Sequence, residues 1–124
     1  MAALREPMNL GDLLKYEAPN LYSRDIATVA AGQNLTLGTV VARDATNKLV
    51  ALDPTAVDSA AVAVGVLAFD IDATLIDQAD AILIARHAIV ASHALTWPAA
   101  ITAEEQIIAI NQLTAAGVLV RQAA

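Results

Sequence analysis

The scarcity of aromatic side chains is the feature that most constrains how this chain can fold. Of its 124 residues, 57% are hydrophobic, yet only four are aromatic and 29 are alanine. A packed interior must therefore be built from Val, Leu, Ile and Ala, and most of these side chains bury little area. A single domain of this length buries only about two-thirds of the surface that its unfolded chain exposes. We therefore expect one small domain that gains stability from oligomerisation or from docking onto a partner.

The charge balance and the absence of cysteine exclude several classes of function. Seven basic against thirteen acidic residues give a net charge of −6, and the Lys and Arg residues are scattered along the chain. Binding to a phosphate backbone requires a basic patch, so nucleic acid is not an expected partner. Without Cys the chain has no disulfide, no thiolate catalysis and no Cys-ligated zinc. It has neither an apolar run of about 18 residues nor a secretory signal, so we expect no membrane partner.

The composition of the chain changes near residue 25. The first 25 residues hold seven charged residues, both Tyr, both Met and two of the four Pro. Pro7 and Pro19 interrupt any long helix there, although residues 11–17 have room for one or two helical turns. We therefore expect an extended N-terminal arm over residues 1–25 and a β-rich globular body over residues 26–124.

The body contains several runs that are typical of β-strands. The strands predicted from these runs are residues 26–30, 35–43, 48–52, 61–69 and 81–91. Asp44 and Asn47 favour a four-residue hairpin loop between the second and third strands. Gly65 indicates a bulge or a close approach of two backbones, and residues 70–80 are expected to form an acidic connection. The pattern predicts a mostly β fold.

One helix is predicted in the C-terminal half of the chain. Thr102 and Glu105 have the spacing of a capping box, in which each side chain accepts a hydrogen bond from the other residue's amide. Ile107, Ile110 and Leu113 recur every three residues and indicate one apolar stripe. Gly117 stands where a helix stop is expected, and residues 118–120 read as a final strand.

An aspartate motif suggests one enzymatic alternative. Residues 69–77 read FDIDATLID, and the D-x-D-x-T pattern resembles the nucleophile motif of haloacid-dehalogenase-like phosphatases. In that family, the residue matching Asp70 is phosphorylated and the one matching Asp72 is the general acid and base. Phosphoryl transfer needs cations to neutralise its transition state, and no Lys follows Asp70. Ala73 also replaces the family's usual Gly, so a small metal-dependent phosphohydrolase remains only the alternative.

The other candidate groups form no catalytic or metal-binding pattern. Asp70, Asp72, Asp77 and Asp80 supply oxygen ligands suited to Ca²⁺, but their spacing lacks the Gly and Glu of an EF-hand loop. His87 and His93 are six residues apart, which separates them by about 20 Å on a strand and places them on different faces of a helix. No serine lies in a nucleophile elbow. We expect no enzymatic activity, no catalytic residues, no bound metal and no cofactor.

The N-terminal arm carries the residues best suited to an interface. Leu10, Leu13, Leu14, Tyr16 and Tyr22 lie in a polar segment, and Tyr is favoured at interfaces because it is large, rigid and amphipathic. Two interpretations follow. Either these side chains contact a partner, or they fold back onto the body.

Taken together, short motifs over nearly the whole chain resemble the lambda-type head decoration proteins of tailed bacteriophages. In the arm they are 10–17 (LGDLLKYE) and 22–24 (YSR). In the body they are 37–41 (LGTVV), 48–52 (KLVAL), 63–67 (AVGVL), 72–74 (DAT), 84–87 (IARH), 95–98 (LTWP) and 111–121 (NQLTAAGVLVR). Their order and spacing, more than any single piece, carry the resemblance. In this light Asp72-Ala-Thr74 is a structural element of the domain.

The resemblance implies a small β-sandwich or barrel-like domain that assembles as a homotrimer at three-fold positions of an icosahedral head. Such proteins attach outside the expanded shell and hold major capsid protein subunits together against the pressure of packaged DNA. The implied location is the exterior of the virion, with assembly in the host cytoplasm. Within the arm, the residues expected to bind the capsid are Leu10, Asp12, Leu13, Leu14, Lys15, Tyr16 and Tyr22. The LGDLLKYE arm is longer than that of lambda's own protein. A trimeric β module that decorates some other assembly is a further alternative.

Overall fold

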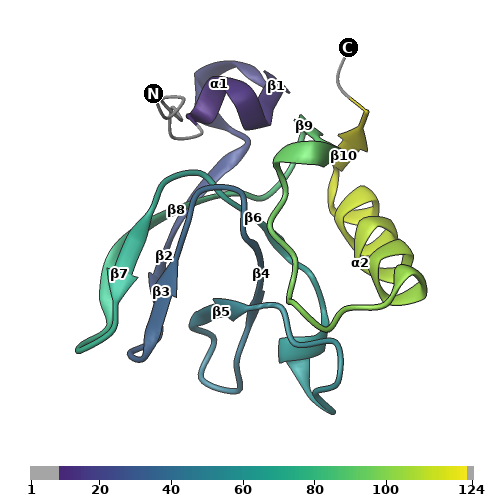
Figure 1. Ribbon diagram of the computed structural model, residues 1–124. Coiled ribbons are helices and arrows are strands. Elements are labelled where there is room, and N and C mark those ends of the chain that lie inside the picture. Colours follow the sequence, from purple (N-terminus) through teal and green to yellow (C-terminus); the bar gives the residue numbers. More distant parts are fainter. Residues whose placement is uncertain (1–8, 123–124) are drawn as a thin grey trace, which may run out of the picture.

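The computed structural model describes residues 9–122 and is organised around a small closed β-barrel. Figure 1 shows the α2 helix along one side of this barrel and the β3–β7 pair on the other. The barrel strands, in spatial order, are β2 (Arg24–Val29), β5 (Leu49–Ala51), β4 (Val40–Arg43), β6 (Gly65–Leu67) and β8 (Gln78–Ile84). The remaining elements are α1 (Leu10–Leu13), β1 (Leu14–Glu17), β3 (Gln33–Leu35), β7 (Ile71–Ala73), β9 (Ala88–Ala91), α2 (Ala103–Ala116) and β10 (Val118–Arg121), with short 3-10 turns at Pro19–Leu21, Ser59–Ala61 and Ser92–Ala94. The predicted mostly β fold with one main helix in the C-terminal half is confirmed.

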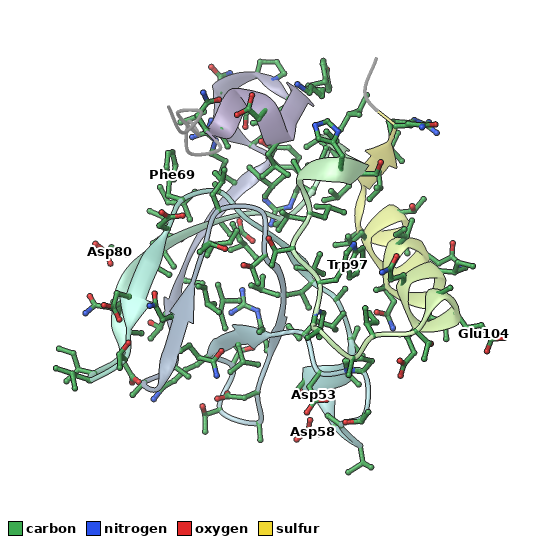
Figure 2. All side chains as sticks on the ribbon, in the orientation of Figure 1. Asp53, Asp58, Phe69, Asp80, Trp97 and Glu104 are labelled. Carbon is green, nitrogen blue, oxygen red and sulfur yellow. The ribbon has the colours of Figure 1, made fainter. Side chains whose placement is uncertain are left out.

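Two aliphatic cores hold these elements together. The first fills the barrel with side chains such as Val29, Leu49 and Leu83. The second lies between the barrel wall, the helix α2 and the three-stranded sheet β1–β9–β10, and it includes Val90 and Leu113. Neither cluster of buried residues contains an aromatic side chain. Trp97 is half-buried and packs at the margin of the second core, near α2 (Figure 2). The interior is thus aliphatic, as the composition requires.

Gly65 permits the closest contact inside the barrel wall. A Cβ atom at this position would lie 2.6 Å from the Ile84 carbonyl oxygen, a separation that real Cβ atoms do not adopt. The β6 strand therefore approaches β8 closely only because Gly65 has no side chain. This confirms the expectation of a close backbone approach at Gly65.

The strand boundaries differ from the sequence prediction at several places. The run 81–91 is two strands, β8 and β9, separated by a turn in which His87 has a φ of 50°. The run 35–43 likewise divides between β3 and β4, and the acidic connection 70–80 contains β7 and the start of β8. Only the last part of 61–69 is a strand. Apolar continuity predicts β structure but does not reveal where the chain turns, because the turn at 85–87 contains neither Gly nor Pro.

The α2 helix has the predicted ends but a different buried face. Thr102 and Glu105 form the capping box, and Gly117 closes the helix with a φ of 98°. The side chains that bury on the core are Ala109 and Leu113, whereas Ile107 is 58% exposed. The predicted stripe was wrong at Ile107 because the helix packs through a small Ala, which allows close approach to the barrel. Among residues 9–122, no helix has the length and apolarity needed to cross a membrane.

The aliphatic barrel makes stability sensitive to single side chains. We expect Leu83→Ala to lower the free energy of unfolding by about 2–5 kcal/mol, because it leaves a cavity in a closed interior. Leu75 is 89% exposed at the turn between β7 and β8, so the same chemical change there should alter stability by less than about 0.5 kcal/mol. Urea denaturation of both variants tests this, and equal losses would contradict the barrel core.

Candidate docking surface around the N-terminal segment

The N-terminal segment begins with a capped helical turn. Asn9 and Asp12 form a reciprocal capping box, in which the Asn9 Oδ1 atom accepts from the Asp12 amide at 3.1 Å and the Asp12 Oδ2 atom accepts from the Asn9 amide at 2.9 Å. This turn places Leu13 in the second core, where it is completely buried. The short α1 helix is therefore anchored on the body by Leu13, with the partly buried Leu10 packed against the same core.

The β1 strand then adds to the edge of β9 and creates an apolar stripe on the outer face of the sheet. Tyr16 pairs with Ile89, and Ile89 pairs with Leu119 of β10. Residues in register on neighbouring strands share a face. The opposite face carries Ala88, Val90 and Val118, which are buried in the second core. Tyr16 is 56% exposed, whereas Ile89 and Leu119 are partly buried, so the stripe Tyr16–Ile89–Leu119 is most open to solvent at Tyr16.

A shallow hollow continues this stripe. It has a volume of about 330 Å³ and is lined by Tyr16, Ala18, His87, Ala88, Ile89, Gly117 and Leu119. Its walls are mostly apolar and come from both ends of the chain. We call the stripe and this hollow the outer sheet surface.

A polar clamp fixes the segment behind β1 to the body. The Arg24 guanidinium donates to both carboxylate oxygens of Glu17, at 2.7 and 3.0 Å. The buried Ser23 hydroxyl donates to the same carboxylate. The Ser23 carbonyl oxygen accepts from the amides of Ala85 and Arg86. The main chain of Ser23 thus ties the N-terminal segment to the turn between β8 and β9, and its side chain holds Glu17 within that segment.

Arg86 holds the other side of this clamp. Its guanidinium donates to the Tyr22 carbonyl oxygen at 2.7 Å and to the Asp25 carboxylate at 2.6 Å. It also lies 5.3 Å from the centre of the Tyr22 ring, which meets the His87 ring edge-on at 5.1 Å. Such cation–π and aromatic contacts orient the Tyr22 ring without burying it, since Tyr22 remains 56% exposed.

Ionisation favours the clamp at neutral pH. The hydrogen bonds from Arg24 lower the pKa of Glu17, and burial opposes that shift only in part. The same contact raises the pKa of Arg24. Hydrogen bonding to Asp25 likewise raises the pKa of Arg86.

The clamp predicts a pH-dependent stability. Because the pKa of Glu17 in the folded state lies below its ordinary value of 4.5, its contribution is complete above that value and is lost as the pH falls through the folded pKa. We expect Glu17→Gln to cost about 1–3 kcal/mol near neutral pH, where it removes charge-assisted hydrogen bonds. The difference from wild type should shrink at an acidic pH below the lowered folded pKa, where Glu17 is itself protonated.

Thermal unfolding at both pH values measures this difference. Glu104→Gln removes one carboxylate from an exposed position on α2 and is the matched control. A Glu17→Gln effect that is independent of pH, or equal to that of the control, would contradict a role for the Glu17 charge.

The seven residues predicted to bind a partner divide into two groups. Leu13 is buried, and Leu10 and Leu14 pack partly buried against the same core. The four on the surface are Asp12, which caps α1, Lys15, whose Nζ atom donates to the Gly11 carbonyl oxygen at 2.9 Å, and the two tyrosines.

The three leucines fold back onto the body, which was the second of the two interpretations of this segment. The segment 9–25 is therefore packed on the rest of the chain, and β2 begins before residue 26. Leu13 and the β1–β9 pairing hold residues 9–17 on the body, and the division into an arm over residues 1–25 and a body over residues 26–124 stays a prediction. Residues 1–8 of the predicted arm lie outside the described part. Binding of a partner by the arm stays a prediction.

Sequence reasoning did not identify Ile89, Leu119 and His87 as surface partners of Tyr16. Ile89 and Leu119 lie in predicted strands, where an outward apolar residue reads like a core residue. Only the strand register brings them beside Tyr16.

The aspartates of 69–77 have structural partners. The Asp70 carboxylate accepts from the Leu37 amide at 2.7 Å, and Asp72 accepts from both the amide and the hydroxyl of Thr74. The Thr74 hydroxyl lowers the pKa of Asp72. Asp77 pairs with Lys48 at 2.6 Å. These carboxylates therefore organise turns, and among the described residues no three acidic or histidine side chains form a metal-binding group.

Together, these elements define a small β-barrel module with a partly apolar outer sheet surface beside its N-terminal segment. A family model described as bacteriophage lambda head decoration protein D matches residues 3–118 of the chain. The chain belongs to this family. No curated protein matches it. The family is structural, and membership places the chain at the phage capsid, as a component of the virion.

Proposed function

We propose that this protein binds the outer surface of the expanded phage head as homotrimers at three-fold positions. There it links neighbouring major capsid protein subunits and stabilises the shell against the pressure of packaged DNA. The proposal includes no enzymatic activity, no cofactor, and neither nucleic acid nor membrane as a partner. Assembly takes place in the host cytoplasm. The observation that carries the capsid contact is the pair of exposed tyrosines on one side of the molecule, Tyr16 at the open end of the Tyr16–Ile89–Leu119 stripe and the clamped Tyr22.

The chemistry of this surface suits a protein partner. Large aromatic side chains dominate interface energetics when a partner covers them. Tyr16 and Tyr22 supply half of the aromatic residues of the chain, and both lie on this side of the molecule at 56% exposure. The exposed Lys15 and Asp12 provide a polar rim next to them.

The rigidity of the surface supports tight binding. The Glu17–Arg24 pair and the Arg86 contacts hold residues 17–25 before any partner arrives. A surface that is already ordered loses less conformational entropy on binding than a loose tail does. Three such surfaces on one trimer would act together, so the avidity for a shell would exceed that of a single contact.

Net charge supports an exterior position. A chain with a charge of −6 is repelled by packaged DNA and has no counterpart to the basic stripes of nucleic-acid-binding proteins. We therefore assign it to the outside of the shell.

Binding to shells tests the capsid contact. We expect Tyr16→Ala to lower the affinity of each binding site on expanded, undecorated heads by about 30-fold, the effect of losing an interface hot spot. Co-sedimentation with the heads measures this affinity. The melting temperature of the variant should stay close to that of wild type because the side chain is exposed. Leu75→Ala, which removes an exposed apolar side chain from the β7–β8 turn, is the matched control. Undiminished binding of Tyr16→Ala would overturn the assignment of this surface.

Deletions separate the arm from the packed segment. A chain without residues 1–8 keeps every contact described above, whereas a chain without residues 1–25 loses Leu13, β1 and the start of β2. We expect the first to fold, with any loss of shell binding assigned to residues 1–8. The second should unfold at a lower temperature. If both deletions bind shells as the full chain does, the contact lies elsewhere on the body.

The oligomeric state is tested separately. Sedimentation equilibrium of the free protein should give three times the chain mass of 12.8 kDa. A single-chain mass at all concentrations would remove the trimer from the proposal while leaving the capsid contact to be judged by the shell experiment.

A further inference from the structure

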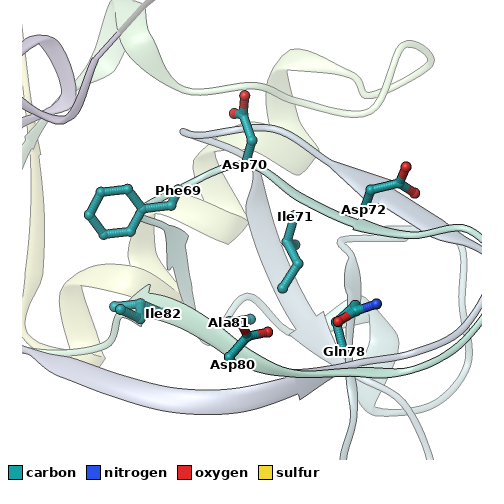
Figure 3. Close-up of a pocket in the computed structure, with 8 residues that line it drawn as sticks. All are labelled: Phe69, Asp70, Ile71, Asp72, Gln78, Asp80, Ala81 and Ile82. Atoms are coloured by element: carbon teal, nitrogen blue, oxygen red, sulfur yellow. The ribbon is translucent and has the colours of Figure 1, made fainter.

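A second surface, distinct from the outer sheet surface, lies where β7 and β8 separate. It is a groove of about 480 Å³ lined by Phe69, Asp70, Ile71, Asp72, Gln78, Asp80, Ala81 and Ile82. Figure 3 shows its two walls, with Phe69 and Ile82 at one end and Asp72 and Gln78 at the other. Phe69 and Asp80 lie on the side of the barrel away from α2 (Figure 2). The groove shares no residue with the outer sheet surface.

The groove exists because β8 pairs with β6, whereas β7, the next strand along the chain after β6, pairs with β3. The chain leaves β6, which pairs with β8 at Leu83 and Ile84, and continues into β7, which pairs with β3 instead. The last main-chain bond between the two walls joins the Ala68 amide to the Ile82 carbonyl oxygen at 2.9 Å. Beyond it the walls diverge as far as the turn that contains Leu75 and Ile76.

One wall of the groove is an unpaired strand edge. Along β8, residues Gln78–Ile84 pair with β2 on one side. On the other side only the end near Leu83 pairs with β6, so residues 78–81 have no neighbouring strand there among residues 9–122. An open edge of this kind is a template for a further extended chain, which supplies the missing main-chain hydrogen bonds.

The acidic side chains that line the groove indicate that an added segment should carry positive charge. Asp70, Asp72 and Asp80 line it, and no cation pairs with them: the three ion pairs within residues 9–122 are Glu17–Arg24, Lys48–Asp77 and Asp25–Arg86. The Asp70 Oδ1 atom accepts from the Leu37 amide, and the Asp72 Oδ1 atom accepts from the amide and the hydroxyl of Thr74. The second oxygen of each carboxylate and both oxygens of Asp80 accept no hydrogen bond from residues 9–122. The exposed Phe69 ring adds a face on which a Lys or Arg side chain can stack.

We propose that this groove binds an extended segment of a partner protein that carries Lys or Arg at alternate positions. The segment adds as a strand to the 78–81 edge of β8. Alternate side chains point to one face of a strand, so basic residues two apart share one face, towards the aspartates Asp70, Asp72 and Asp80 that line the groove. The apolar residues between them face Ile71 and Ala81, which pack at the barrel core. This inference concerns a different surface from the proposed capsid contact and does not depend on it.

A designed peptide provides the probe. We would titrate the isotope-labelled full-length protein with Ac-VKVKVKV-NH2 and, separately, with Ac-VEVEVEV-NH2, and follow the backbone amide resonances. The basic peptide should shift the amides of 69–73 and 78–82 and slow their hydrogen exchange, and the acidic peptide should not. Binding should weaken as salt is raised above about 0.1 M, because exposed charges are then screened.

Two matched variants localise the effect. Asp80→Asn should weaken binding of the basic peptide about two- to fivefold, the range for one exposed charge pair. Glu104→Gln makes the same change of charge on α2 and should leave binding unchanged. The amide spectra themselves report that both variants are folded.

Three other results would overturn the proposal. Shifts spread over the whole surface, or equal effects of the two variants, would mean non-specific attraction to an acidic protein and would overturn the proposal. Groove shifts with CaCl₂ but not with the basic peptide would make the groove a cation site instead. Absence of any shift with the basic peptide at low salt would also reject it.

Discussion

The bonds of Ser23 join the two halves of this structure. Its carbonyl oxygen receives the amides of the 85–87 turn, and its hydroxyl completes the Glu17–Arg24 pair. That turn separates β8, a barrel strand, from β9, the central strand of the outer sheet. The position of the sheet on the barrel, and therefore of Tyr16 and Tyr22, follows from this contact. A buried polar group that finds all its partners specifies one arrangement of its neighbours.

The aliphatic composition explains both the fold and its exposed surfaces. Two small cores made of Val, Leu, Ile and Ala stabilise a barrel and a sheet, and Gly65 lets the barrel wall close tightly. A chain of this length cannot bury all of its apolar side chains. Of those left outside, Tyr16 lines the outer sheet surface and Phe69 lines the β7–β8 groove, whereas others, such as Ile26 and Ile107, lie elsewhere on the surface.

The two surfaces differ in their physical character. The outer sheet surface is apolar, held rigid by ion pairs behind it, and suited to a complementary protein face. The groove is acidic and offers an open strand edge. The proposed contact at the first would depend on shape and buried area, whereas the one proposed at the second would depend on main-chain pairing and on salt.

The sequence by itself determined the class of fold, the ends of α2, the 44–47 hairpin and the family, because caps, turn residues and β-rich runs act locally. It also singled out Tyr16 and Tyr22. It did not show that Leu13 is buried, or that Ile89 and Leu119 lie beside Tyr16. Only the tertiary structure decided these assignments, because an apolar side chain on a strand or helix looks the same in sequence whether it faces a core or solvent. The strand register and the bonds of Ser23, which join residues more than 60 positions apart, make that choice.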